Sequence, residues 1–285
     1  MTAPSARRVA WAGALVYGLL TAISIVAFFT MVGRPIPAGF DAGRWQAGYE
    51  FGMRHFGALI IVAGYVAAVA SLAAAVGLRR ALLGSTLVVA MTTTVECLGA
   101  ATGFPFGEHG YGRELGWLVL GLVPFTIPLS WFLMLHASLG IALRFGRGPV
   151  ATLVLSALGL FAWDVLMEPA MSAAYPFWFW RSSGVWYGMP LANWASWLVI
   201  GPAIAFALWR VAGDGLRNLA HDPLPVALYA LTGLLPLALA LKFRLYPAAA
   251  VGGLAMLAYM LAPATPRVAR WRQARALLRR PRPAA

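Results

Sequence analysis

The sequence is poor in charge and nearly free of cysteine. Only 11% of its 285 residues are charged, whereas soluble domains carry roughly 25%, so an ordinary water-soluble domain is excluded. Cys97 is the single cysteine, which excludes an intrachain disulfide. Acids are especially scarce, at 9 against 22 basic residues. Any acid inside an apolar segment is therefore a candidate for function.

Apolar residues make up most of the chain, at 61% with a mean hydropathy of +0.76. Crossing the ~30 Å hydrocarbon layer takes about 20 residues of helix. The sequence predicts an all-α, polytopic membrane helix bundle with about eight transmembrane helices. No linker, low-complexity run or fixed-period repeat is visible, so we expect one integral-membrane domain over residues 1–285. The predicted spans are 9–33, 55–77, 81–103, 117–143, 149–171, 191–210, 224–241 and 245–263.

The basic residues predict the orientation of these helices. With the N-terminus in the cytoplasm, 15 Lys and Arg residues fall on the cytoplasmic side and 7 on the outer side. This bias favours cytoplasmic termini, with residues 264–285 as a basic cytoplasmic tail. We attribute the net charge of +13 to topology and to attraction by anionic lipid, not to nucleic acid. The longer connections, 34–54, 104–116 and 172–190, are then on the outer face.

Three acids fall inside predicted spans, namely Glu96, Asp164 and Glu168. Acids in membrane helices are rare and usually face the bundle interior or a cavity. Asp164 and Glu168 share a helix face because they are four residues apart. Under the predicted topology all three lie in the outer half, at the depth of Asn193. Pro169 predicts that the helix ends or bends just after Glu168.

The segment 175–197 contains five of the 12 tryptophans. An interfacial aromatic belt and a cage of π faces both explain this density. The segment 104–116 contains Glu108, His109 and Glu114, which are a weak metal motif, and His109 as a proton relay stays open. We expect neither a metal nor a cofactor. Pro124 and Pro128 predict a kink in the fourth span.

Four stretches resemble one known family. They are Glu96 with Gly99, "FPFG" with Tyr111 and Leu115–Gly116, "IPLSWFLM", and "WDVLMEPAM" followed by "GVWYGMPLANWASW". In order and spacing they resemble the bacterial and archaeal carotenoid-biosynthesis membrane proteins that include the carotenoid 1′,2′-hydratases and bisanhydrobacterioruberin hydratases. The resemblance covers roughly residues 90–200. Two departures are Glu168, where the family has aspartate before proline, and His109, where an aromatic residue is usual.

This resemblance implies a hydratase that adds water across the terminal C1′=C2′ double bond of a linear carotenoid. Asp164 and Glu168 are then the expected acid–base pair, with Glu96 as a third candidate catalytic residue. The expected substrate-binding residues are Phe106, Tyr111, Trp131, Trp186, Tyr187, Asn193 and Trp194. The expected partners are a lipid-soluble carotenoid, membrane lipid and other carotenoid enzymes. The expected location is the cell membrane of a bacterium or archaeon.

Three alternatives stay open at the level of sequence. A transporter would use Glu96 and Asp164 as a proton relay, but paired broken helices are not visible. A non-catalytic carotenoid-binding partner of a biosynthetic complex would need the aromatic residues but not the acids. A prenyltransferase would carry an Asp-rich, magnesium-binding pair of motifs, which this sequence lacks.

Overall fold

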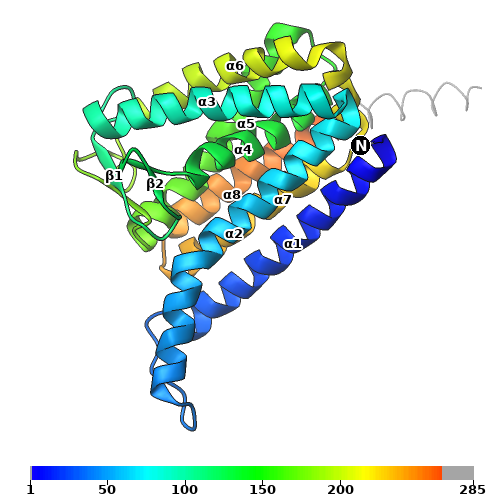
Figure 1. The fold of residues 1–285 in the computed structure, drawn as a ribbon. Coiled ribbons are helices and arrows are strands. Elements are labelled where there is room, and N and C mark those ends of the chain that lie inside the picture. Colours follow the sequence, from blue (N-terminus) through cyan, green and yellow to red (C-terminus); the bar gives the residue numbers. More distant parts are fainter. Residues whose placement is uncertain (1, 265–285) are drawn as a thin grey trace, which may run out of the picture.

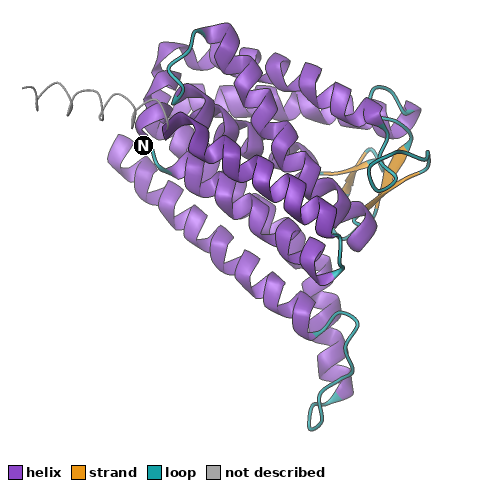
Figure 2. Ribbon diagram, turned by 180° about the vertical axis from the view of Figure 1, so that it is seen from behind, coloured by secondary structure: helices purple, strands orange, loops and turns teal. Residues whose placement is uncertain are grey.

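The computed structural model describes residues 2–264, and this part of the chain forms a bundle of eight α-helices (Figure 1). Short strands gather at one end of the bundle (Figure 2). The helices are α1 (Ala3–Thr30), α2 (Ala42–Val76), α3 (Leu78–Thr102), α4 (Thr126–Leu143), α5 (Pro149–Pro169), α6 (Leu191–Ala212), α7 (Leu224–Lys242) and α8 (Tyr246–Leu261). The strands are β1 (His109–Tyr111), β2 (Leu118–Val119), β3 (Val123–Pro124) and β4 (Trp178–Trp180). A π-helical turn, Ala170–Ala174, follows α5, and 3-10 turns cover Gly213–His221 and Ala262–Ala264.

Seven of these helices are long and apolar enough to cross a membrane, and α8 is a shorter apolar helix of 16 residues. The predicted polytopic helix bundle is thus confirmed. Successive helices run in opposite directions, so the N-terminus and the end of α8 lie at one end of the bundle and the strands at the other (Figure 1). Which end faces the cytoplasm stays a prediction. The predicted basic tail lies, apart from Ala264, outside the described residues.

The predicted outer connection 34–54 is wrong in its second half. The side chain of Asp41 accepts a hydrogen bond from the backbone N–H of Arg44 at 2.8 Å, and α2 begins directly after this cap. Asp is among the best N-cap residues because its carboxylate satisfies a free N–H of the first turn. The 35-residue α2 is therefore about 52 Å long. Its first turns project from the bundle beyond the end of α1 (Figure 1).

The predicted span 117–143 is also wrong in its first part. Residues 118–124 form a hairpin in which β2 pairs with β3, and α4 begins only at Thr126. Leu120 and Gly121 have positive φ angles of 52° and 72°, as a tight turn requires. Pro128 lies in the first turn of α4, where no intrahelical partner for its missing N–H is needed. The predicted mid-helix kink is thus replaced by a hairpin and a helix start.

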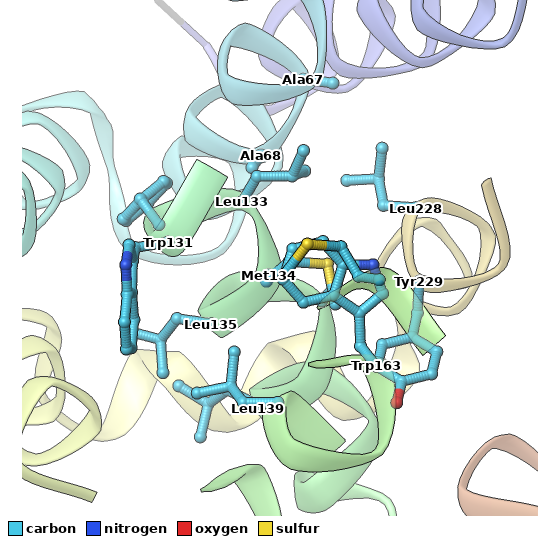
Figure 3. Close-up of a cluster of buried hydrophobic side chains, with 14 of the residues drawn as sticks. Ala67, Ala68, Trp131, Leu133, Met134, Leu135, Leu139, Trp163, Leu228 and Tyr229 are labelled. Carbon is cyan, nitrogen blue, oxygen red and sulfur yellow. The ribbon is translucent and has the colours of Figure 1, made fainter. Parts of the chain in front are cut away.

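Helix α4 forms the centre of the core and packs against α2, α3, α5 and α7. Figure 3 shows Met134 of α4 between α2 and α7, with Trp131 and Trp163 on different sides. Polar groups in this core bond across helices: the Tyr229 hydroxyl donates to the Gly159 carbonyl oxygen at 2.7 Å. Such bonds satisfy polar groups that water cannot reach. This packing positions the last turns of α3 and α5 and the first turn of α6 at the end of the bundle that carries the strands.

Candidate active site

The polar residues singled out inside the helices meet at the strand end of the bundle. Glu96 lies near the end of α3, Glu168 near the end of α5, and Asn193 in the first turn of α6. All three line one cavity of about 140 Å³. Most of its other lining side chains are aromatic or aliphatic. The cavity is thus an apolar space that two carboxyl groups and one amide face.

Glu96 is buried, with 5% of its surface exposed, and each of its oxygens has a donor. The Trp131 indole donates to Oε1 at 2.7 Å, and the Tyr111 hydroxyl donates to Oε2 at 2.7 Å. The Nε2 atom of His109 lies 4.0 Å from the same Oε2. Burial and the charge of Glu96 raise the pKa of Tyr111 well above its ordinary value of 10.0. Tyr111 therefore stays a neutral donor.

Glu168 is 3% exposed and is held at one oxygen only. The indole N–H groups of Trp178 and Trp180 both donate to its Oε1, at 2.8 Å and 2.5 Å. No hydrogen bond to Oε2 is found among the described residues. The side chain lines the cavity. An indole donates but cannot accept, so these bonds fix one oxygen and leave the other available.

A small sheet connects the two carboxyl groups. Strand β1 pairs antiparallel with β4, placing His109 opposite Trp180 and Tyr111 opposite Trp178. Side chains two residues apart on a strand share a face. One face of this sheet therefore carries the donors to Glu168 together with Tyr111 and His109 at Glu96. On the other face Gly110 lies opposite Phe179, and a Cβ at Gly110 would meet the Phe179 ring at 2.6 Å.

Asp164, one of the three expected catalytic residues, does not reach the surface of the cavity. It is fully buried and is not among the residues that line the cavity. The Asn193 amide donates to its Oδ2 at 3.3 Å, while its Oδ1 has no hydrogen-bond partner among the described residues. Asn193 itself lines the cavity. Asp164 is therefore separated from the cavity by one side chain.

The predicted substrate-binding residues divide into two groups. Phe106, Tyr111, Trp131 and Asn193 line the cavity. Three others do not, and form a neighbouring aromatic cluster in which Trp186 packs against Tyr187 and Trp194. The Trp186 indole donates to the backbone oxygen of Val165 at 3.1 Å, one residue after Asp164. This cluster therefore packs against the last turns of α5.

Sequence reasoning missed several aromatic residues of the cavity wall. Trp197 stacks on Trp131 with ring centroids 3.8 Å apart and planes at 11°. Trp163 packs edge-on against Trp197 at 6.1 Å. Trp178 and Trp180 were noted only as part of a dense aromatic segment. Their alternation in "WFW", matched by His109 and Tyr111 in "HGY", was the available signal for a strand pair.

The local geometry of α5 and α3 adds two details to the site. The α-helical geometry of α5 ends at Pro169, as predicted, and continues as the π-helical turn. The hydroxyls of Thr92 and Thr93 donate to backbone oxygens of their own helix, as in a purely structural role. No group of three His, Cys, Asp or Glu residues within the described part of the chain is arranged to hold a metal ion.

Residues 56–259 match the family model described as "Carotenoid biosynthesis protein". The chain belongs to this family. It is also 35% identical, over 150 residues, to the bisanhydrobacterioruberin hydratase of Haloarcula japonica. That alignment covers 50% of this chain and 50% of the relative, so the chain matches about half the length of this curated relative. No solved structure matches the chain. The resemblance inferred from the four sequence stretches is confirmed.

Proposed function

We propose that this member of the carotenoid biosynthesis family is a hydratase that adds water to the terminal double bond of a linear carotenoid. The observation that carries the proposal is a buried aromatic cavity lined by two carboxyl groups, Glu96 and Glu168, each held by N–H or O–H donors. The name of the Haloarcula japonica relative supports the same reaction class. The substrate would enter from the bilayer of the cell membrane.

The reaction begins with transfer of a proton to the CH carbon of the alkene. This step forms a C–H bond, breaks the O–H bond of a carboxylic acid and leaves a tertiary carbocation. We assign the acid to Glu168, because its Oε1 is held by two indoles while its Oε2 is free to carry a proton into the cavity. Two buried carboxyl groups four residues apart resist carrying two negative charges. Asp164, the other member of the expected acid–base pair, therefore helps to keep one proton on the pair.

The second step adds water to the carbocation. A C–O bond forms, and a carboxylate takes the proton that the bound water loses. Glu96 suits this role since Tyr111 and Trp131 stabilise its ionised form through two hydrogen bonds. His109, 4.0 Å away, can pass the proton on. The products are a tertiary alcohol and, after the proton returns to Glu168, the starting enzyme.

The aromatic wall stabilises the charged intermediate. A cation over an aromatic face gains up to about 2 kcal/mol when both are desolvated. Trp131, Trp163 and Trp197 line the cavity together with the two indoles that hold Glu168. In the proposed reaction, water is the nucleophile that ends the lifetime of the carbocation.

The test is expression of the chain in a host that accumulates lycopene, followed by mass spectrometry of the pigments. The expected product is heavier than lycopene by one water molecule per reacted end. Membranes from these cells should also convert added lycopene after the proton gradient is collapsed, which a proton-coupled transporter would not do. Unchanged lycopene in both experiments contradicts the proposal.

A further inference from the structure

A second cavity, of about 220 Å³, lies between the end of α1 and the first half of α2. It shares four lining residues with the carboxylate cavity: Gly57, Ile60, Phe177 and Leu235. The two cavities are therefore neighbours with a common wall. Along α2 the second cavity extends from Gly48 to Ile60, which is about 18 Å of helix. The second cavity is therefore elongated, and it extends along α2 away from the residues that it shares with the carboxylate cavity.

The lining of this second cavity is chemically uniform. It includes no charged residue, and Ser24 and Tyr49 are its polar side chains. Ile23, which lines this cavity, is 51% exposed, so the cavity opens at the surface that α1 presents to lipid. A long apolar molecule dissolved in the bilayer fits this chemistry. A polar or charged ligand would lose its hydration here without finding partners.

Glycines leave the space along α2 open. A Cβ built on Gly48 or Gly52 would meet no atom within 4 Å. At the common wall, a Cβ on Gly57 would lie 3.0 Å from the side chain of Leu115. Glycine in a helix costs up to about 1 kcal/mol relative to alanine. Glycines at these three positions keep the second cavity and its junction wide enough for a bound chain.

We propose that the second cavity binds the polyene chain of the same linear carotenoid whose end group occupies the carboxylate cavity. This inference rests on the function proposed above. Ten of its fifteen lining residues precede residue 56, where the match to the family begins. The part of the chain before the family match thus supplies most of the lining of the second cavity, while the matched part supplies most of the lining of the carboxylate cavity.

The experiment measures pigment retained by the purified protein, since this readout does not depend on turnover. The variants Gly52→Phe and Gly48→Phe place a ring in the second cavity. The control Ala47→Phe adds a ring on the same helix at an exposed position that lines neither cavity. Each protein is purified from lycopene-accumulating cells, and the absorbance ratio of pigment to protein is compared after size-exclusion chromatography.

We expect both glycine variants to retain about tenfold less pigment than Ala47→Phe, which corresponds to a loss of about 1.4 kcal/mol in binding. Should either substitution prevent folding, Gly52→Leu gives a smaller, graded obstruction. Pigment retention equal to the control in the folded glycine variants overturns the proposal. Native mass spectrometry that finds phospholipid, and not carotenoid, displaced by the new ring overturns it as well.

The same proteins separate this inference from the proposed function. If wild-type protein retains lycopene in a Gly52-sensitive manner but forms no hydrated product, the hydratase assignment fails and the binding site stands. If hydrated product forms equally in the control and in Gly52→Phe, the hydratase assignment stands and the binding site fails.

Discussion

Replacement of Glu168 by glutamine tests the proton donor directly. The Oε1 atom accepts both indole N–H groups, from Trp178 and Trp180, and a glutamine oxygen can accept them equally. The amide nitrogen then takes the place of the free Oε2. The variant keeps the size, the helix and both hydrogen bonds, but it cannot release an acidic proton.

The expected loss follows from the chemistry that remains. Removing a general acid typically costs 10²–10⁴-fold in rate, and that is about 3–5 kcal/mol in activation free energy. We expect the upper part of this range because the cavity is apolar and an alkene has no lone pair that water can protonate first. Both oxygens of Glu96 already accept a hydrogen bond, one from Tyr111 and one from Trp131. Glu96 is therefore a poor substitute for Glu168 as a proton donor.

The assay is conversion of lycopene by membranes that hold equal amounts of each protein, with products separated by chromatography and identified by mass. Glu50→Gln is the matched control, because Glu50 is an exposed residue of α2 whose side chain, within residues 2–264, bonds only Gln46. The control should convert at the wild-type rate. Conversion by Glu168→Gln within threefold of the control, roughly 0.7 kcal/mol in activation free energy, refutes the assignment. The acid role then passes to Glu96.

Three further outcomes are expected. Asp164→Asn should lower conversion, though less than Glu168→Gln does, while the protein stays folded in the membrane, because the amide leaves Glu168 without the second carboxyl group that helps to keep its proton; near-wild-type conversion removes Asp164 from the mechanism. Tyr111→Phe should lower conversion about tenfold, as expected for losing one hydrogen bond to a charged group, and should shift the pH profile to higher pH, because Glu96 loses a hydrogen bond that stabilises its ionised form; an unshifted profile contradicts this. Gly110→Ala should push the Phe179 ring, which is 45% exposed, off its rotamer at a cost of about 0.5–1.5 kcal/mol, and Phe179→Ala in the same chain should restore thermal stability and conversion; no rescue contradicts the contact seen in the structure.

The helix bundle could be predicted well because membrane-spanning segments are governed by one strong signal, apolar length. Where prediction failed, a local polar interaction outweighed that signal. The carboxylate of Asp41 starts α2 about a dozen residues before the apolar span. At residues 118–124 the side chains are apolar enough for a helix, but the turn at Leu120 and Gly121 makes a hairpin instead.

The site was predictable in part for a similar reason. Acids inside membrane helices are costly, so Glu96, Asp164 and Glu168 were visible from composition alone. Helical periodicity places Asp164 and Glu168 on one face, but it does not say which of the two reaches a cavity. That depends on Asn193, which comes from another helix and lies between Asp164 and the open space. Contacts between distant segments of this kind leave no periodic pattern in the sequence.

The β1–β4 sheet gives the site a property that neither helix has alone. Backbone bonds continue the pairing beyond both strands: the Gly112 N–H donates to the Phe177 oxygen at 2.8 Å, and the Arg181 N–H donates to the Glu108 oxygen at 2.9 Å. The four side chains at the two carboxyl groups are therefore mounted on one continuous ladder. Any displacement of that ladder moves Tyr111 and His109 at Glu96 together with Trp178 and Trp180 at Glu168. In the proposed mechanism, proton delivery at one carboxyl group and proton removal at the other thus depend on a single element, the β1–β4 ladder.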